Sequence, residues 1–399
     1  MSAPLEHSQY ESFVWDMSLP TNGQKLVSRA ELSQGYWPVP GENPYLLVGG
    51  SEAIRQVMGD TETLAPDNAL TAVTHLEPAS LRILLSYGFS LPEVLASAKG
   101  ELHRSVRQLV ASFFTPQKVR AQEEGVRARM KEVLAERAPG RGQLAVFHLL
   151  PVALMQKLTG VPSQDYLAQG LDEAELARYS LDSLELFWGW VEPERQQELA
   201  HRAGQFHRKL SALVAGCAER PETLFGALAN QKIESARIVS LAYFLAIAGQ
   251  YTTCLLMNSI LHAGVIQQWG ITLGQCTDFS RAQELVRAVL QAESSVPTWR
   301  RVATADSSIG GCPVHAGQEV LLEVSGQQSD DYRLAFGWGA HRCLGALLAE
   351  SESTWMLHEL ACWLEHEKLS LHLAEEPRWL DLLSYRAPLE LKFEVRNEF

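Results

Sequence analysis

One ten-residue segment constrains this chain more than any other feature: Phe336-Gly337-Trp338-Gly339-Ala340-His341-Arg342-Cys343-Leu344-Gly345. It sets a single cysteine in a loop rich in glycine, and an apolar stretch with helical character follows directly. Glycines at 339 and 345 let a backbone pass close to a flat, bulky group. The first amides of the following helix would stabilise negative charge on the sulfur. A thiolate held in this way is a strong ligand for iron. The plain alternative is a buried structural cysteine in a tight turn.

The composition limits the classes of partner and compartment. The chain has 399 residues, 46% of them hydrophobic, which is enough for a sizeable core. Its formal net charge of −13 argues against nucleic acid as a general partner. The six cysteines lack paired spacing, which indicates a reducing compartment. The longest apolar run, 238–249, is shorter than a membrane span, and the first twenty residues contain no apolar signal segment. We therefore expect a soluble, cytoplasmic protein.

Hydrophobic periodicity predicts a mainly α-helical chain with a small β portion, and no segment has the composition of an interdomain linker. We expect one domain over residues 1–399. The predicted helices cover 52–58, 101–114, 116–137, 144–158, 193–218, 236–267, 280–292 and 345–364. The predicted strands cover 45–48, 301–303, 320–324 and 389–393.

The cysteine loop resembles that of cytochromes P450, Phe-x-x-Gly-x-His-x-Cys-x-Gly, with every fixed position filled: Phe336, Gly339, His341, Cys343 and Gly345. The resemblance extends from about residue 20 to the C-terminus, although only some segments carry it strongly. It implies the cytochrome P450 fold, haem b as cofactor, and the Cys343 thiolate as the ligand of its iron.

Four basic side chains occur where the resemblance places partners of the haem carboxylates. His103 and Arg107 are one helical turn apart, so both project from the same face. Arg301 opens a predicted strand, and His341 lies two residues before the cysteine. Taken singly, each is more often a surface charge or a satisfied histidine. Burying two carboxylates requires cations or strong donors, and the four together favour the haem interpretation.

The long helix 236–267 contains Ala248-Gly249-Gln250-Tyr251-Thr252-Thr253. The matching family segment crosses the distal face of the haem. The resemblance therefore implies that Ala248 and Gly249 line the oxygen site and that Thr252 supplies a hydroxyl for proton delivery. Tyr251 stands where the family usually has an acid. A phenol, with a pKa of about 10, relays protons poorly compared with a carboxylate.

The chain departs from the family pattern in two further places. The usual Glu-x-x-Arg pair is missing from its register, which falls on Ala288-Val289-Leu290-Gln291, while Glu284-Leu285-Val286-Arg287 lies one turn earlier. The earlier pair could substitute, but the sequence after it favours loss. The segment before Phe336 is also short, and Glu350 replaces the arginine usual after the cysteine. These changes remodel the face where a ferredoxin would dock.

The leading hypothesis is a haem-thiolate monooxygenase that acts on a small organic molecule, free or bound to a carrier protein, in the tailoring of a specialised metabolite. A ferredoxin-type protein would supply electrons. One alternative is a haem-thiolate enzyme that uses peroxide, or catalyses dehydration or isomerisation, and turns over without a reductase. The other is a non-catalytic protein on the same fold that recruits enzymes to a carrier.

Overall fold

The computed structural model describes residues 13–14, 45–135, 149–326 and 330–397. These residues are mainly helical, as the sequence predicts. The principal helices are α2 (Ser51–Gly59), α3 (Pro78–Ser86), α4 (Gly100–Phe113), α5 (Pro116–Arg120), α6 (Glu123–Ala135), α7 (Leu149–Thr159), α8 (Ser163–Ala168), α9 (Glu173–Trp188), α10 (Pro193–Cys217), α11 (Leu224–Asn230), α12 (Ser235–Ala246), α13 (Thr252–Val265), α14 (Phe279–Ala292) and α15 (Ala346–Glu367).

Strands form small, separate sheets. The largest has the order β2-β7-β4-β3, with β2 parallel to β7 and the other pairs antiparallel. The hairpins β5–β6 and β9–β10 and the sheet β1-β11-β8 complete the strands. Their bounds are β1 (Phe13–Val14), β2 (Tyr45–Val48), β3 (Leu64–Ala65), β4 (Thr298–Ala303), β5 (Ser307–Ile309), β6 (Cys312–Val314), β7 (Glu319–Glu323), β8 (Leu369–Leu373), β9 (Arg378–Leu382), β10 (Tyr385–Glu390) and β11 (Lys392–Asn397).

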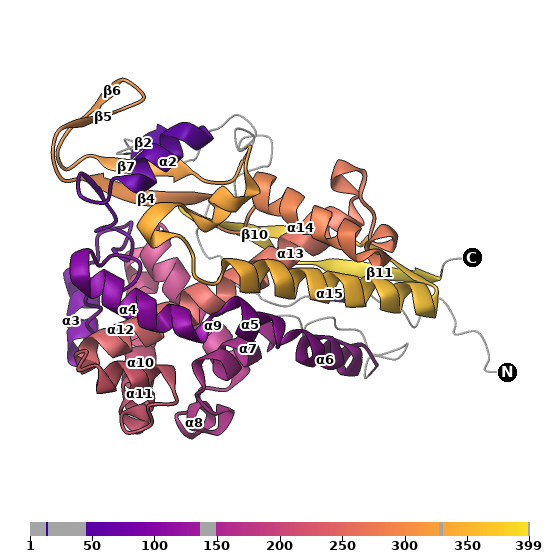
Figure 1. Ribbon diagram of the computed structural model, residues 1–399, viewed down its shortest axis with the longest axis horizontal. Coiled ribbons are helices and arrows are strands. Elements are labelled where there is room, and N and C mark those ends of the chain that lie inside the picture. The colour runs from indigo at the N-terminus through magenta and orange to yellow at the C-terminus, as the bar shows by residue number, and fades with distance from the viewer. Residues whose placement is uncertain (1–12, 15–44, 136–148, 327–329, 398–399) are drawn as a thin grey trace.

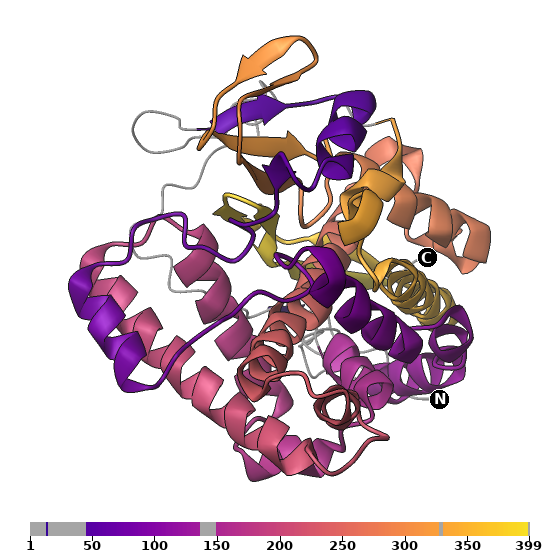
Figure 2. The same cartoon turned by 60° about the vertical axis from the view of Figure 1, so that its left-hand side comes forward.

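The largest sheet and α2 lie at one end of the molecule, and the rest consists mainly of helices, with β10 and β11 among them (Figures 1 and 2). The helix α10 packs against α3, α9 and α12. The helix α15 packs against α6, α13 and α14, and in Figure 1 it runs across the front of the molecule. This arrangement places the loop before α15 beneath the sheet and close to α4.

The long central helix is interrupted. Five residues, Ile247–Tyr251, form a π-helical segment between α12 and α13. Such wide turns are common at functional sites. By length and composition Ser235–Val265 could cross a membrane, but 72% of its most apolar window is buried inside the protein. That burial is typical of a core helix, which agrees with the interpretation of the apolar run at 238–249.

Predicted and observed elements agree best where one face is polar. The strand Tyr45–Val48 has its predicted bounds, and α4, α10 and α14 differ by one residue at each end or less. The single helix predicted over 116–137 is wrong, because the structure divides it into α5 and α6. The helix α9 was not predicted, because it is buried on every side from Tyr179 to Trp188 and so lacks an amphipathic period.

Gly226 in α11 is a position where the fold requires glycine. The helix α11 packs on α4 and α12, and a Cβ atom at 226 would collide with the backbone carbonyls of Arg220 and Cys217. Backbone atoms cannot move aside as a flexible side chain can. We therefore expect Gly226→Ala to lower the free energy of unfolding by about 1–3 kcal/mol, measured by denaturant titration.

The matched control is Gly216→Ala in α10, where a Cβ atom would meet nothing within 4 Å. Alanine is the better helix former, so this variant should keep or raise stability by up to about 1 kcal/mol. Equal destabilisation by the two substitutions would contradict the packing explanation.

Candidate functional site

A cavity of about 240 Å³ lies between the central helix, β4 and the cysteine loop. One part of its lining is basic and the remainder is largely apolar. The predicted site residues that line it are Cys343, Arg107, Arg301, His341, Ala248, Gly249, Thr252, Phe336 and Gly345. The fold thus brings together residues that are up to 238 positions apart, from α4, the π-segment, β4 and the loop before α15.

The cysteine loop presents its sulfur to this cavity. The Cys343 amide donates a hydrogen bond to the Phe336 carbonyl, with 2.8 Å between the atoms, which closes the loop. Cys343 is accessible through the cavity but lies deep in the protein, and burial raises the pKa of its thiol. The Gly345 amide and the charges of Arg107 and Arg342 act in the opposite direction and favour the thiolate.

Two glycines in the loop, Gly339 and Gly345, differ in how closely the surrounding atoms would approach a side chain. Gly339 adopts φ +70°, and a Cβ atom there would lie 3.0 Å from the Met58 carbonyl oxygen, so the loop's own fold requires it. It does not line the cavity, contrary to its predicted role beside a flat group. At Gly345 the nearest atom to a Cβ would be the Cys343 sulfur at 3.8 Å, an ordinary contact.

The basic side of the cavity contains buried nitrogens without hydrogen-bond partners. Three nitrogens on this side have no partner among the described residues: His103 Nε2, His341 Nδ1 and Arg301 Nε. The rings of His103 and His341 lie 4.3 Å apart between centroids, and His341 Nε2 is 3.0 Å from the Ala98 carbonyl oxygen. His103 lies behind His341 and does not itself line the cavity. Because His341 Nε2 donates to that carbonyl, His341 Nδ1 donates only when the ring is protonated, whereas Arg301 Nε is always a donor. Buried polar atoms without partners are costly unless a ligand forms hydrogen bonds with them.

Electrostatics point to the same kind of ligand. Burial lowers the pKa of Arg301 to about 10. Burial, with the neighbouring charges of His103, Arg301 and Arg107, lowers the pKa of His341 to about 4. A negatively charged group in the cavity would stabilise the protonated forms of Arg301 and His341 and so raise both pKa values. A planar ligand with two carboxylates, such as haem, therefore fits the donor set present.

The π-segment contributes Ala248 and Gly249 to the cavity lining, and the start of α13 contributes Thr252. The Thr252 hydroxyl donates to the Ala248 carbonyl at 2.6 Å, and the Ser295 hydroxyl donates to the Thr252 carbonyl at 2.8 Å. A Cβ atom at Gly249 would approach the Met155 Cε to 2.8 Å. The absence of a side chain at 249 therefore makes room for the Met155 side chain as well as for the cavity. Ser295 was not predicted as a site residue, although it lies in the lining.

Tyr251 does not line the cavity. It is 1% exposed, and burial holds the pKa of its phenol well above the ordinary range. Successive helical residues point in different directions, so Thr252 can face the cavity while Tyr251 faces the core. Its predicted place among the catalytic residues is therefore corrected to a place in the core packing.

Glu284 and Arg287 bind other residues. Glu284 pairs with Arg281, and Arg287 Nε lies 2.7 Å from Glu350 Oε1. Gln291, in the usual register of the family's arginine, accepts hydrogen bonds at its backbone carbonyl from Gly326 N and the Ser325 hydroxyl. The earlier pair therefore does not reproduce a Glu-x-x-Arg contact, in agreement with the interpretation that this contact is lost.

A buried acid, Glu352, lies beside the site and was not predicted. It is fully buried on α15, and burial raises the pKa of its carboxyl to about 8, with Thr253 opposing the increase. Thr253 lies on α13 and lines the cavity. Glu352 is one turn after Leu348 and one turn before Met356, so the helical period could have placed it on the apolar face.

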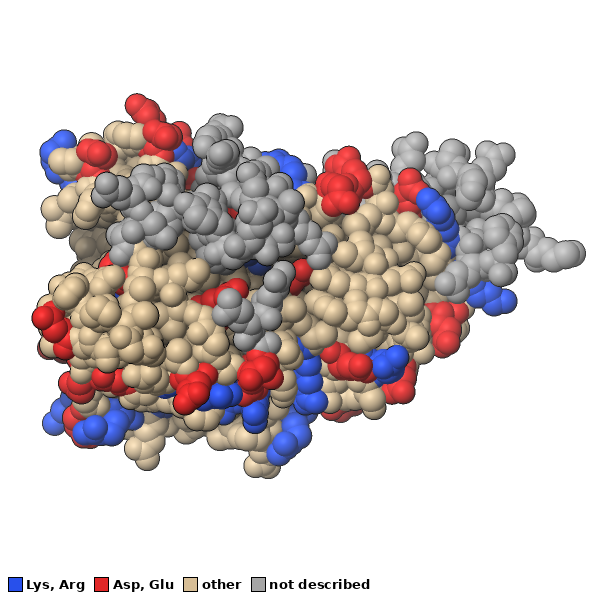
Figure 3. All heavy atoms as spheres, turned by 90° about the horizontal axis from the view of Figure 1, so that it is seen from above, with Lys and Arg blue, Asp and Glu red and all other residues tan. Residues whose placement is uncertain are grey.

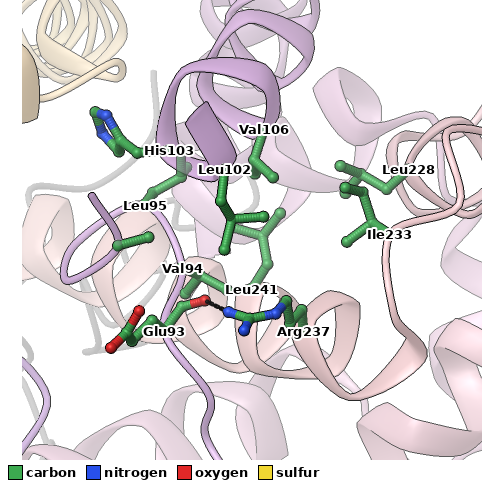
Figure 4. A pocket seen from close by; sticks show the side chains of 11 residues that line it. Glu93, Val94, Leu95, Leu102, His103, Val106, Leu228, Ile233, Arg237 and Leu241 are labelled. Carbon is green, nitrogen blue, oxygen red and sulfur yellow. Dashed lines mark hydrogen bonds between the residues drawn. The ribbon is translucent and has the colours of Figure 1, made fainter. Parts of the chain in front are cut away.

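Outside this site, a small cavity behind α4, an open surface hollow of about 430 Å³ beside Arg55 and Asp331, and mixed surface charge give no second candidate among the described residues. A cavity of about 10 Å³ behind α4, room for about one water, is lined mainly by apolar side chains (Figure 4). Arg237 Nη1 donates to the Glu93 carbonyl at its edge. On the face in Figure 3, charges of both signs are mixed and no broad basic patch is visible.

Comparison with known proteins finds similarity to cytochromes P450. No family model matches the chain. Three curated relatives are the erythromycin C-12 hydroxylase of Saccharopolyspora erythraea (24% identical, covering 65% of this chain and 70% of the relative), cytochrome P450 CYP105Q4 of Mycobacterium marinum (24%, 86% and 86%) and the mycinamicin IV hydroxylase/epoxidase of Micromonospora griseorubida (25%, 89% and 90%).

Solved structures show the same similarity. Cytochrome P450 CREJ in complex with (4-ethylphenyl) dihydrogen phosphate has a TM-score of 0.78 at 22% identity and covers 88% of this chain and 92% of its own. P450BioI in complex with hexadec-9Z-enoic acid ligated acyl carrier protein has a TM-score of 0.70 at 20% identity, over 89% and 94%.

The raised pKa of Glu352 makes a prediction about stability. Between the pKa that the Glu352 carboxyl has in the unfolded chain and a pH of about 8, the folded protein holds a proton on this group that the unfolded chain has lost. Stability from this group is therefore complete at low pH and is lost as the pH rises towards 8. The glutamine in Glu352→Gln stays neutral, so the melting temperature of this variant should rise relative to that of the parent protein as the pH increases from 5 to 8.5. The exposed Glu365→Gln, on the same helix, should show a constant difference. A constant difference for Glu352→Gln as well would disprove the assignment.

Proposed function

We propose that this chain, a member of the cytochrome P450 family and an oxidoreductase of that kind, tailors a specialised metabolite by oxidising a small apolar molecule. The observation that carries the proposal is the placing of Cys343 and of the unpaired buried nitrogens of His341 and Arg301 around one cavity. Relatives named as hydroxylases and oxygenases favour monooxygenation over the alternatives of peroxide-driven chemistry, dehydration or mere recruitment.

The chain's own residues divide the work of holding the cofactor. The Cys343 thiolate would bind the iron, and His341, Arg301 and Arg107 would bind the carboxylates, with His103 behind His341 fixing its ring. Bound there, haem supplies the activation of oxygen at a thiolate-ligated iron. The Gly345 amide and the two neighbouring arginines oppose the increase in the thiol pKa that burial causes.

The wall opposite Cys343 would receive the substrate and oxygen. Ala248 and Gly249 keep side-chain volume low there, and Thr252 holds a hydroxyl at the cavity through its bond to the Ala248 carbonyl. Because Tyr251 faces the core, a proton would reach the cavity through hydroxyl groups such as that of Thr252. Because position 251 lacks the acid that is usual in the family, the proton path would differ from one that uses a carboxylate there.

The cavity lining also indicates the class of substrate. Its charged residues, Arg107, Arg301 and Arg342, belong with His341 to the part of the lining assigned to the carboxylates. The remaining wall is mostly apolar or aromatic and includes Phe244, Val296, Trp299 and Tyr385. Such a lining excludes water and favours an uncharged, largely apolar substrate, oriented by a few polar groups such as Ser294 and Ser295.

The proposal extends to compartment and partners. All six cysteines are free, which suits the cytoplasm. Electrons would come from a ferredoxin-type protein that docks on the side of the cysteine loop. The acyl carrier protein bound by P450BioI supports testing carrier-bound substrates as well as free ones.

The first test is the spectrum of the protein reduced and exposed to carbon monoxide. We expect a strongly red-shifted Soret band from the parent protein, because thiolate donates charge to the iron. Cys343→Ser should lose this band. The control Cys312→Ser, an exposed cysteine in the β5–β6 hairpin, should keep it. Protein that binds no haem, or an unchanged band in Cys343→Ser, would refute the proposed function or its ligand.

A further inference from the structure

We infer that two arginine clamps fasten the segment leading into Cys343 and so hold the thiolate in place. The first joins Arg287 to Glu350 and Tyr332; the second joins Arg55 to Asp331 and Trp338. The inference rests on the proposed function, since it assumes that Cys343 binds haem iron. It assigns Arg287 and Arg55 as positioning residues, because neither contacts the cavity's sulfur.

The segment needs support from side chains. From Tyr332 to His341 its regular structure consists of two short 3₁₀ turns, η5 (Tyr332–Phe336) and η6 (Gly339–His341). Hydrogen bonds in such turns have poorer geometry than those of α-helices. Gly337 and Gly339, both with positive φ, add conformational freedom to the unfastened chain. Contacts to α2, α14 and α15 must therefore fix the path of the loop.

Arg287 connects three elements in the first clamp. It extends from α14, and its Nε lies 2.7 Å from Glu350 Oε1 on α15. Its guanidinium carbon lies 5.1 Å from the centre of the Tyr332 ring in η5. The Glu350 side chain is 15% exposed, so this contact is partly shielded from solvent. One guanidinium thereby ties the start of the segment to the helix that follows Cys343.

Arg55 makes an equivalent set of contacts from α2. Its Nη2 lies 2.8 Å from Asp331 Oδ2, and its guanidinium carbon lies 5.3 Å from the centre of the Trp338 ring. Asp331 also receives hydrogen bonds from Arg333, and these bonds, with that from Arg55, lower the pKa of its carboxyl. The Trp338 amide donates to Met58 Sδ on the same helix. The second clamp thus ties two points of the segment before the cysteine, Asp331 and Trp338, to α2.

The two clamps occupy the region where the chain departs from its family. Glu350 is the residue that replaces an arginine, and Arg287 on α14 forms an ion pair with it where α14 packs against α15. The charges are therefore complementary in a new arrangement, which explains how the loop is held without the usual pair. Exposed ion pairs and cation–π contacts are individually weak, so the effect should depend on both clamps together.

The test uses Arg287→Gln, Arg55→Gln and the double variant, each prepared with haem. The matched control is Arg281→Gln, also on α14: its side chain is 41% exposed against 42% for Arg287, and it pairs with Glu284 on its own helix. We measure haem transfer to excess apomyoglobin, and the decay of the red-shifted carbon monoxide band in reduced protein. We expect both rates to rise ~3-fold in each single variant and ~10-fold in the double variant, with no change in Arg281→Gln.

The melting temperature of the haem-free protein separates positioning from general stability. If the clamps position the loop, the double variant should melt within the range of Arg281→Gln before haem is added, while its band decays faster. Rates equal to those of Arg281→Gln would overturn the inference, as would a fall in the melting temperature that accounts for them. Parent protein without haem would instead refute the proposed function, so the two failures are distinguishable.

Discussion

The structure depends on a constraint set by unmet hydrogen bonds. His103, His341 and Arg301 place nitrogens in the interior that have no hydrogen-bond partner among the described residues. A buried donor without an acceptor costs free energy, and several together around one cavity would weaken the fold unless an anion joined them. The requirement explains why α4, β4 and the cysteine loop converge, and it links the stability of this region to the ligand proposed for Cys343.

The fold could be predicted from the sequence where local patterns had a clear period. Amphipathic helices such as α4 and α14 show alternation between a polar and an apolar face, and the cysteine loop has a dense set of fixed positions. The helix α9 could not be found, because its second half has no polar face. The division of 116–137 into α5 and α6 depends on tertiary packing, which local propensity does not report.

The site was predictable residue by residue only in part. The spacing of His103 and Arg107 and the loop around Cys343 identified side chains that the structure places around one cavity or directly behind its lining. Tyr251 was assigned from its neighbour's role, and a single step along a helix turned it towards the core. Tyr385 and Ser295 come from distant elements whose approach to the cavity leaves no local pattern. The partnership of Arg287 with Glu350 likewise depends on the packing of two helices that are separate in sequence.

The distance along the chain between the adjacent rings of His103 and His341 has a consequence for biosynthesis. The helix carrying His103 leaves the ribosome long before the segment with His341 and Cys343, because these residues are separated by more than half of the chain. Contacts between distant segments form slowly, since the intervening loop must be closed first. The nascent protein therefore passes through a long interval in which half of its basic pocket exists without the other half. Assembly of the pocket, and with it any loading of cofactor, belongs to the last stage of synthesis.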